Sequence, residues 1–443
     1  MLFSALEFIF LFLPISVGVY FLLPRRCKNV WLLLSGLLFY GIGEPRYLPL
    51  MVFTILADYL FGRWLEKNDR GRTAARGILA FALVFNIGQL ALFKYFDPLG
   101  WGLPIGISFY TFQALSYVID VYRRKVSATG SIVDFGAYVS LFPQLIAGPI
   151  VKYSDLEREL KERKHSTERI AWGVRTFCAG LAKKVILANP AGEMWELLSS
   201  GESAAELWLG VLFFSFQIYF DFSGYSDMAV GLGRVFGFDF PQNFNYPYIS
   251  QSITEFWRRW HMTLSGWFRE YVYIPLGGNR GGRLKTYRNL LLTWILTGIW
   301  HGAGVNFLLW GLYFALILIM EKAFLGRWLE KAWSSVRHVY SLLLIGVGWI
   351  IFALDGSIVI SLKTLMALGE APLWRGAATS QLVRNIPFIM IMAVGCTPLP
   401  KKLYLKIRER IALVDIVLPV LSFGFSLAYI VSSGYDPFLY FRF

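Results

Sequence analysis

The chain has 443 residues, of which 56% are hydrophobic, 17% aromatic and only 16% charged. Its mean hydropathy is +0.51, and soluble domains carry about 25% charged residues. A soluble protein of this length would have too little polar surface to cover itself, so the composition predicts an all-α polytopic membrane protein. The net charge of +14 does not indicate nucleic-acid binding, because the basic residues cluster in short loops between apolar runs, where the positive-inside bias places them.

The cysteines and the N-terminal run carry no sign of a metal site or a cleaved leader. Cys27, Cys178 and Cys396 are scattered without metal-ligand spacing, which predicts apolar filler rather than a disulfide or a metal site. Residues 2–23 form an apolar run without a basic n-region or a small-residue cleavage site. We expect this run to be the first spanning helix.

The first part of the chain alternates apolar runs with basic loops. Spanning helices are expected at residues 2–23, 30–42, 47–64 and 77–93. The basic loops at 25–28 and 63–76 are expected in the cytoplasm, which places the N-terminus and the turn at 43–45 outside. Residues 103–113 are broken by Pro and Gly and predict a kinked or re-entrant segment, and residues 134–150 form another apolar run.

The second part continues this pattern after an amphipathic helix at 154–164, with His165 on its solvated face. Membrane runs are expected at 173–187, 205–235, 290–299, 304–320, 340–354 and 411–431. A loop at 370–384, a short apolar piece at 385–394 and a basic cytoplasmic loop at 401–410 complete the pattern. No repeat is obvious and no soluble segment is long enough to fold alone. We therefore expect one integral-membrane domain over residues 1–443.

Residues 254–302 stand out because ionisable side chains interrupt apolar, aromatic sequence. Such groups are costly at membrane depth and by default mark a functional site or a water-filled cavity. Two of the four histidines, His261 and His301, fall here. The candidate residues that line a donor site or tunnel are Trp257, Arg258, Arg259, Trp260, Arg269, Tyr273, Asn279, Arg280, Trp300, Asp221 and Asp227.

His301 is the leading candidate for chemistry. It ends an apolar run, and Gly302 to Gly304 would give the backbone room for a substrate. A neutral imidazole is suited to take a proton from a hydroxyl, so that the oxygen attacks a thioester carbonyl. The alternative is a structural histidine in the core whose hydrogen bonds are made within the protein. His261, flanked by Trp257 and Trp260, is expected to orient His301, to bind the acyl donor or to fill a polar pocket.

Two further features suggest binding or internal pairing. Residues 275–280 form a glycine turn beside basic side chains, a plausible place for a phosphate or a phosphopantetheine arm, although the glycines alone are a weak signal. Asp221 and Asp227 lie within an apolar run and need partners. We expect them to pair with Arg258 or Arg259 or to line the cavity, and a structural ion pair is as good an interpretation as a chemical role.

Three motifs follow one another as Glu255-Phe-Trp-Arg-Arg-Trp-His261, Arg269-Glu-Tyr-Val-Tyr-Ile-Pro-Leu-Gly-Gly-Asn-Arg280 and Gly298-Ile-Trp-His301-Gly302. Other segments agree with them: Phe109-Tyr-Thr-Phe-Gln113, Phe142-Pro-Gln144, Phe220-Asp-Phe-Ser-Gly-Tyr-Ser-Asp227 and Pro241-Gln-Asn-Phe244. Together they resemble the membrane-bound O-acyltransferase (MBOAT) family. The match is closest to its bacterial branch of alginate O-acetylases and teichoic-acid D-alanyl transferases, and it covers nearly the whole chain.

This resemblance implies a ring of about ten to twelve transmembrane helices with re-entrant segments around a central tunnel, in a bacterial inner membrane. It implies His301 as the catalytic histidine and His261 as a second functional one. The donor would be a cytoplasmic thioester, either acetyl-CoA or the phosphopantetheine thioester of an acyl carrier protein, with no tightly bound cofactor. The acceptor would be an extracytoplasmic polysaccharide such as alginate, reached with a separate extracytoplasmic partner protein.

Other functions stay open at this stage. A polytopic chain with broken helices and buried acids could be a transporter, although no inverted repeat is visible. It could also be a scaffold subunit of a polysaccharide synthase. Within acyl transfer, D-alanylation of teichoic acid is the alternative to acetylation, and the sequence identifies neither the polymer nor the donor.

Overall fold

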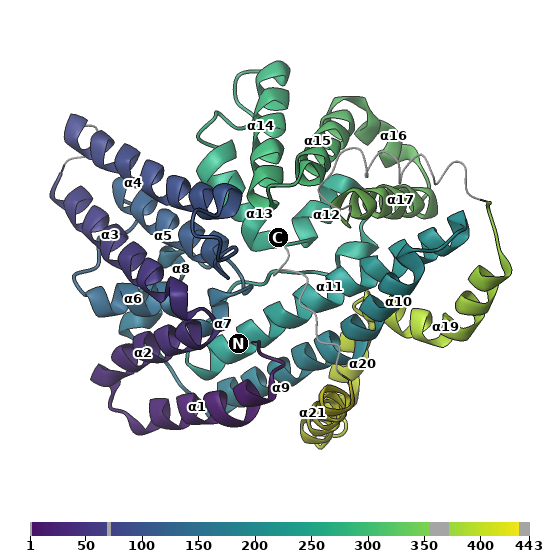
Figure 1. Ribbon diagram of the computed structural model, residues 1–443, viewed down its shortest axis with the longest axis horizontal. Helices are drawn as coiled ribbons and strands as arrows, with labels where there is room; N and C mark the ends of the chain where they lie inside the picture. Colours follow the sequence, from purple (N-terminus) through teal and green to yellow (C-terminus); the bar gives the residue numbers. More distant parts are fainter. Residues whose placement is uncertain (1, 69–71, 354–371, 434–443) are drawn as a thin grey trace. The chain divides into compact units, whose positions relative to one another are not determined.

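A computed structural model describes residues 2–68, 72–353 and 372–433, and within these ranges every regular element is a helix (Figure 1). The predicted all-α class is confirmed. Within the same ranges, seven helices are long and apolar enough to cross a membrane: Pro45–Lys67, Thr73–Phe96, Ala204–Val235, Val305–Lys331, Ser334–Ala353, Gly376–Gly395 and Val414–Ser432. Phe8–Leu22 is a shorter apolar helix.

These seven candidates come from the described residues alone, and other runs expected to span are shorter or carry more charge. Helix α2 (Arg25–Gly43), for example, holds Arg25, Arg26 and Lys28 in its first turn. Helix α5 (Ile107–Tyr122) is only 16 residues long. Helix α14 (Arg283–His301) has 19 residues, but its first two turns hold Arg283, Lys285 and Arg288. The run at 134–150 is divided by a break at residue 141 into α6 (Ile132–Ser140) and the single turn α7 (Phe142–Leu145).

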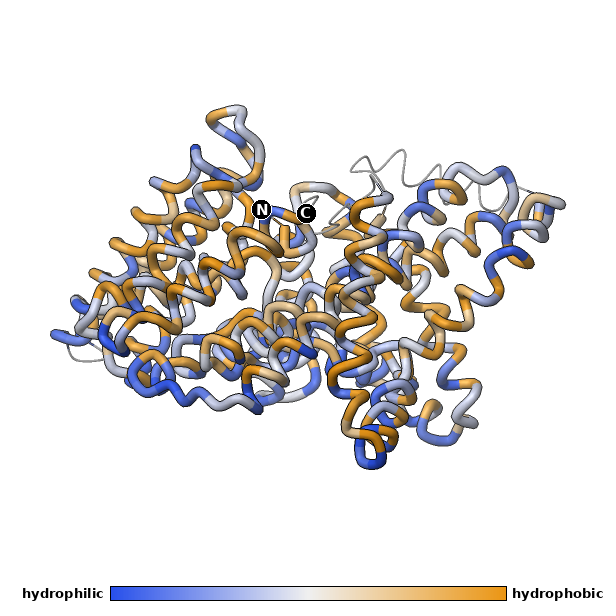
Figure 2. The backbone as a smooth tube through the Cα atoms, turned by 90° about the horizontal axis from the view of Figure 1, so that it is seen from below, coloured by the Kyte–Doolittle hydropathy of each residue, from blue (hydrophilic) through white to orange (hydrophobic). Residues whose placement is uncertain are grey.

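The helices divide into two compact units, one of residues 1–181 with 225–241 and one of residues 182–224 with 242–443. Helix α11 (Ala204–Val235) contributes to both. Hydrophobic residues lie along the lengths of the helices, and hydrophilic residues gather at many of the helix ends and turns (Figure 2). Large apolar side chains on the candidate spans remain exposed, such as Phe81, Val84, Phe425 and Val431. Lipid chains would solvate such faces, as expected for membrane helices.

The first unit is built on α1 (Leu13–Leu22), α2 (Arg25–Gly43), α3 (Leu48–Lys67), α4 (Thr73–Ala91), α5, α6, α7, α8 (Tyr153–Lys161) and α9 (Thr167–Ala182). Helix α5 packs on α3 and α4, and α2 packs on α6. Every residue of α5 from Ile107 to Val121 is buried. The Pro- and Gly-containing segment at 103–113 therefore leads into a helix enclosed by protein, and the amphipathic helix expected at 154–164 is α8.

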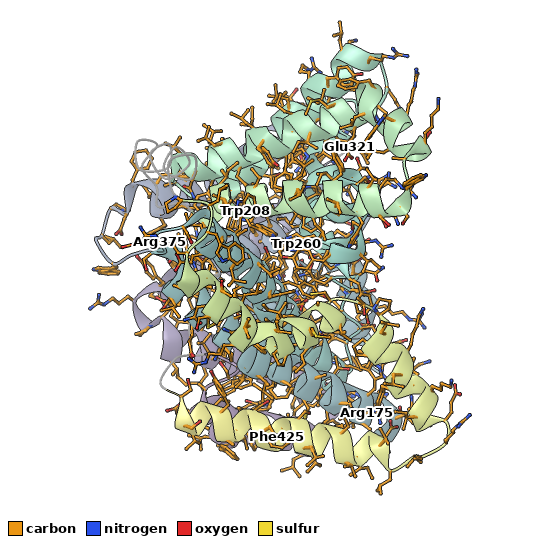
Figure 3. All side chains as sticks on the ribbon, turned by 90° about the vertical axis from the view of Figure 1, so that its right-hand side faces the viewer. Arg175, Trp208, Trp260, Glu321, Arg375 and Phe425 are labelled. Carbon is orange, nitrogen blue, oxygen red and sulfur yellow. The ribbon has the colours of Figure 1, made fainter. Side chains whose placement is uncertain are left out.

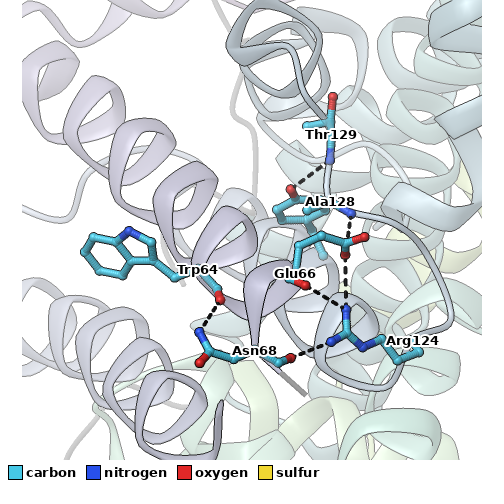
Figure 4. Close-up of polar contacts among 7 residues, drawn as sticks. Trp64, Glu66, Asn68, Arg124, Ala128 and Thr129 are labelled. Carbon is cyan, nitrogen blue, oxygen red and sulfur yellow. Dashed lines mark hydrogen bonds and ion pairs between the residues drawn. The ribbon is translucent and has the colours of Figure 1, made fainter. Parts of the chain in front are cut away.

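Gly106 shows why the start of α5 needs a glycine. Its φ is +77°, in the left-handed region that suits glycine, and a Cβ there would lie 2.7 Å from the carbonyl oxygen of Leu145. At the other end of the helix, side chains tie the turn after α5 to the end of α3 (Figure 4). The Glu66 carboxylate accepts hydrogen bonds from Arg124 and from the Ala128 backbone.

The second unit contains the 254–302 stretch. Its helices after α11 are α12 (Ile253–Arg259), α13 (Met262–Phe268), α14, α15 (Val305–Met320), α16 (Gly326–Lys331), α17 (Ser334–Ala353), α19 (Gly376–Gly395), α20 (Leu399–Arg408) and α21 (Val414–Ser432). Before α11 it holds the π-helical turn η4 (Lys183–Ala188) and α10 (Asn189–Ser199). The predicted loop at 370–384 is wrong from Gly376 onward, because a regular helix begins there. Residues 370–371 and 354 lie outside the described ranges.

Helices α14 and α15 form a closely packed antiparallel pair, joined by a short turn. A Cβ on Gly298 would lie 2.4 Å from the carbonyl oxygen of Phe307, and one on Gly311 would lie 2.5 Å from that of Trp294. Small residues at these two positions let the backbones approach, as at many membrane helix interfaces. The approach holds the C-terminal end of α14, where His301 lies, firmly against α15.

Helix α12 is held in place by Glu321, which follows α15. The Glu321 carboxylate accepts hydrogen bonds from the backbone N–H groups of Ile253, at 2.7 Å, and Thr254, at 2.8 Å. A carboxylate at a helix N-terminus accepts hydrogen bonds from backbone N–H groups that have no partner within the helix. Its negative charge also interacts favourably with the positive end of the helix dipole. Figure 3 labels Glu321 and Trp260, the residue that follows α12.

Candidate active site

His301 is the last residue of α14, and it is buried among aromatic rings. The ring of Trp310 on α15 meets its imidazole edge-on at 4.9 Å between centroids, and Phe352 on α17 does so at 5.3 Å. The neighbouring Trp300 ring lies at 4.9 Å. Three helices thus converge on this imidazole and enclose it in an aromatic, water-poor environment.

His261 is also buried, in the turn between α12 and α13. Its φ is +42°, a left-handed conformation that costs a residue with a Cβ roughly 1–2 kcal/mol. Backbone strain of this kind is often found at functional sites. The ring of Phe222, from α11, packs edge-on against the imidazole at 4.7 Å. Burial lowers the pKa of His261 to about 3, so its imidazole is neutral near pH 7.

Asn243 determines which nitrogen of His261 carries the proton. Its Oδ1 lies 3.0 Å from His261 Nδ1 and also accepts from the hydroxyl of Thr263, at 2.9 Å, and the backbone N–H of Thr263, at 3.4 Å. A backbone N–H can only donate, so the atom that faces it must be the amide oxygen. His261 therefore donates from Nδ1, and its Nε2 keeps the lone pair.

The indole of Trp300 connects the two histidines. Its ring centroid lies 6.4 Å from that of His261 and 4.9 Å from that of His301. Residues 40 positions apart in the sequence thus contact the same buried side chain. The sequence placed both histidines in one functional stretch, and the structure brings them together on one aromatic ring.

Other predicted residues divide into an inner and an outer group. Trp257 packs on Trp310 at 5.4 Å, and Trp260 is buried against Trp349 at 4.8 Å. Both belong to the aromatic cluster around His301. In the outer group the side chains reach the surface or are only half-buried: Arg258, Arg259, Arg269, Tyr273, Asn279 and Arg280.

The outer group forms its own contacts. Arg259 pairs with Glu255 at 2.9 Å, one turn away on the same helix, and the Tyr273 hydroxyl donates to Asn279 Oδ1 at 2.7 Å. The glycine turn is real, because Gly277, Gly278, Gly281 and Gly282 all have positive φ. Asn279 and Arg280 are thus exposed on this sharply turning segment before α14, and Arg269 is exposed at the start of the π-helical turn η6 (Arg269–Tyr273).

Two sequence-based expectations need correction. Asp221 does not pair with Arg258 or Arg259, because its ion-pair partner is the buried Lys184, at 3.0 Å. The space beside Gly302 is filled by the ring of Phe307, which a Cβ would approach to 2.3 Å. That glycine is explained by packing rather than by room for a substrate. Asp227 is half-buried on the part of α11 that belongs to the first unit.

Comparison with known proteins decides the family. The model of the MBOAT, membrane-bound O-acyltransferase family, matches residues 116–362, more than half of the chain. The chain belongs to the MBOAT family. It is therefore an O-acyltransferase and a multi-pass membrane protein, and membership favours acyl transfer over the transporter and scaffold alternatives. Both histidines lie inside the matched range.

Several relatives are similar over most of their length. A probable alginate O-acetylase of Azotobacter vinelandii is 42% identical over 80% of this chain and 75% of its own. A peptidoglycan O-acetyltransferase of Helicobacter pylori is 37% identical over 73% of this chain and 71% of its own. A teichoic acid D-alanyltransferase of Bacillus subtilis is more distant, at 26% identity over 64% of this chain and 77% of its own.

Three residues in or near this candidate site were missed by sequence reasoning. Asn243 stood inside a recognised motif, so a buried amide just before the histidine stretch was an available signal. Trp310 lies in an apolar run, where one aromatic residue looks like any other. Lys184 interrupts the expected span at 173–187, and a lysine within a membrane run is itself the signal for a buried acidic partner.

Proposed function

We propose that this MBOAT enzyme transfers an acetyl or another small acyl group from a cytoplasmic thioester donor to hydroxyl groups of an extracytoplasmic polysaccharide such as alginate. The observation that carries the proposal is the contact of His261 and His301 with one buried indole. Identities of 40–42% to probable alginate O-acetylases support an acetyl group and an alginate-like acceptor.

His301 acts as the general base in this proposal. Its imidazole takes the proton from an acceptor hydroxyl, and the oxygen attacks the thioester carbonyl to form the new C–O bond. Collapse of the tetrahedral intermediate breaks the C–S bond. The proton held by the imidazole then passes to the departing thiolate, which leaves His301 neutral for the next cycle. The aromatic enclosure limits water, which would otherwise hydrolyse the thioester.

His261, which contacts the same Trp300 ring as His301, supports this chemistry. Its neutral state and its tautomer, set by Asn243, leave the lone pair on Nε2. A ring held in this way can accept a hydrogen bond from the acceptor hydroxyl or from the amide groups of a phosphopantetheine arm. Of the roles expected for His261, positioning of the reactants is the one that its fixed geometry favours.

Trp310 is a further candidate for a direct contact. Its ring packs against His301, it is buried, and its indole N–H meets no hydrogen-bond acceptor among the described residues. A buried N–H without an acceptor costs roughly 1–3 kcal/mol. An acceptor oxygen on the bound substrate would remove that cost. The developing oxyanion of the thioester carbonyl is suited to the role.

The donor and the partner complete the proposal. Both acetyl-CoA and an acyl carrier protein present a thioester on a phosphopantetheine arm. The turn at 277–282, which contains the exposed Asn279 and Arg280, offers backbone N–H groups and a cation for its phosphate. Delivery to a polymer outside the membrane calls for a separate extracytoplasmic protein.

The test is acyl transfer by purified protein with His301→Ala. We expect activity to fall about 10²- to 10⁴-fold, the usual value of general-base catalysis, while thermal stability stays near that of the wild type. The matched control is His338→Ala, because His338 is half-buried on α17 and hydrogen-bonds to the Ser250 carbonyl rather than to the site. Activity of the His301 variant within a few-fold of the control would refute the mechanism.

D-alanyl transfer to teichoic acid is the second candidate, supported by the teichoic acid D-alanyltransferase relatives at 26–29% identity. The same purified protein distinguishes the two when it is offered acetyl-CoA, an acetyl-carrier protein and a D-alanyl-carrier protein in parallel. Preference for the D-alanyl donor would replace the acetyl group in the proposal and leave the role of His301 intact.

A further inference from the structure

A large basic pocket lies in the first unit, where the turn between α1 and α2 meets the chain that follows α8. It encloses about 1020 Å³. Its lining includes Arg25, Lys28, Asn29, Asp134, Arg163 and Lys164. Counting all its side chains, six cations face two carboxylates, and one of those cations, Lys161, already pairs with Glu157 outside the lining. We call this region the basic pocket.

Arg163 shows that the excess charge is built into the fold. Its guanidinium lies over the ring of Phe238 at 4.9 Å and over Tyr20 at 5.7 Å. Its Nη2 donates to a neutral acceptor, the Asn29 Oδ1, and its buried Nη1 meets no acceptor among the described residues. Asp134 and Glu159 act on this cation at longer range without an ion pair to it, and burial still lowers the pKa of Arg163, so its charge is costly where it lies. An anion in the adjoining pocket would offset that cost.

The surrounding cations are arranged around the same space. Lys28 Nζ lies 4.3 Å from the centre of the Tyr20 ring, and burial together with Arg163 and Arg25 lowers the pKa of Lys28. Burial and the same cations lower the pKa of His165 to about 4, so this histidine is neutral and adds no charge. Its Nε2 is hydrogen-bonded to the Tyr20 hydroxyl at 3.0 Å, so it is not the solvated surface residue that the sequence predicted.

An apolar surface adjoins the cations. Leu22, just before the turn, is 86% exposed, and Phe21 and Val30 are exposed as well. Val30 also lines the pocket. A ligand that suits both surfaces has an anionic head and apolar chains. Basic pockets beside the ends of membrane helices bind the headgroups of anionic lipids for this reason.

We propose that the basic pocket binds the phosphate headgroup of an anionic phospholipid. Arg25, Lys28 and Lys164 contact the phosphate oxygens, and Arg163 supplies the buried charge behind them. The acyl chains lie against Leu22 and Val30. A folded acidic protein is the less suitable occupant, because its carboxylates would not reach the recess in which Arg163 lies while also covering exposed leucine.

The test measures retention of phosphatidylglycerol and phosphatidylcholine by the purified protein, with native mass spectrometry of lipid-titrated samples. The pocket variant is Arg25→Gln with Lys28→Gln. The control is Lys401→Gln with Lys402→Gln, which removes the same charge from exposed positions on α20. We expect phosphatidylglycerol affinity to fall roughly tenfold or more in the pocket variant and less than about twofold in the control.

Four results would overturn the proposal. Equal losses in both variants would mean non-specific attraction to charge. Wild-type protein that retains phosphatidylcholine as well as phosphatidylglycerol would remove the headgroup selectivity. An unchanged lipid affinity in the pocket variant, with loss of binding to an acidic acyl carrier protein, would assign the pocket to that protein. Competition with inorganic phosphate distinguishes a lipid headgroup from free phosphate. Loss of bound phosphatidylglycerol at millimolar phosphate would make the ligand a free phosphate, whereas continued binding of the lipid supports the proposal. None of these measurements requires acyl-transfer activity.

Discussion

At the scale of single residues, the site depends on how His261 is held. Three constraints act on it: a left-handed backbone, an edge-on contact with Phe222 and a hydrogen bond to Asn243. The sequence selected His261 and His301 as candidates because histidine is rare in this chain and ionisable groups are rare in apolar runs. It could not identify Asn243 or Trp310, because a side chain's neighbours across turns and helices are set by packing rather than by spacing.

Replacement of Asn243 tests whether the tautomer of His261 matters. Asn243→Ala removes the acceptor of the Nδ1 proton, and we expect activity to fall about 10- to 100-fold, corresponding to the roughly 1–3 kcal/mol cost of an unsatisfied buried group. Asn243→Asp keeps the acceptor and adds a negative charge, which favours the imidazolium and raises the pKa of His261. Inactivation at low pH should therefore begin at a higher pH in this variant than in the wild type.

A pH–rate profile of the three proteins is the measurement. If Asn243→Asp shows the wild-type profile, or Asn243→Ala keeps wild-type activity, then Asn243 does not set the state of His261.

At the scale of helices, the second unit is organised by a few polar contacts between apolar elements. Lys184, in the π-helical turn η4, pairs with Asp221 on α11 and donates to Asn189 at 2.8 Å. Asp221 immediately precedes Phe222, which packs on His261. The ion pair thus fixes the rotation of α11 that presents Phe222. Hydropathy predicted α11 well, since apolar length is a property of the sequence alone, but the partner of its carboxylate required the tertiary structure.

Removal of one charge from this pair should be far more damaging than removal of both. Asp221→Asn leaves Lys184 charged and buried, and we expect it to lower the free energy of unfolding by about 3–5 kcal/mol. The double variant Lys184→Met with Asp221→Leu should recover much of that loss. The control is Glu157→Gln, which breaks the exposed pair with Lys161 and should cost about 0–1 kcal/mol.

Thermal or denaturant unfolding in detergent measures these differences. A double variant as unstable as Asp221→Asn would mean that the pair stabilises through specific contacts rather than through mutual neutralisation.

At the scale of the whole molecule, composition was sufficient to predict the class, because few sequences this apolar can remain soluble. Helix boundaries were predicted well for α11, expected at 205–235 and found at Ala204–Val235, but α2 begins at Arg25 rather than at residue 30. The start of α19 was missed because its first turns contain polar and charged residues, so hydropathy does not rise where the helix begins. Residues 25–28 form the first turn of α2 and residues 401–408 belong to α20, so these two basic segments are helical and the predicted loops are wrong there. The orientation of the chain in the membrane stays a prediction from the basic segments at residues 25–28, 63–76 and 401–410.

The natural cysteines provide a direct test of that orientation. Cys27 is exposed in the first turn of α2, within the basic segment 25–28, whereas Cys178 and Cys396 are buried. If this segment is cytoplasmic, a membrane-impermeant maleimide should label Cys27 only after the cells are permeabilised.

The matched control is Gly43→Cys combined with Cys27→Ser, because residue 43 is exposed at the opposite end of α2 and is expected outside. It should be labelled in intact cells. Helix α2 is not among the seven candidate spans, because Arg25, Arg26 and Lys28 lie in its first turn, but its 19 residues are roughly 28 Å long at 1.5 Å per residue, close to the thickness of the hydrocarbon core. The two positions should therefore report opposite sides, and labelling of Cys27 from outside would reverse the predicted topology.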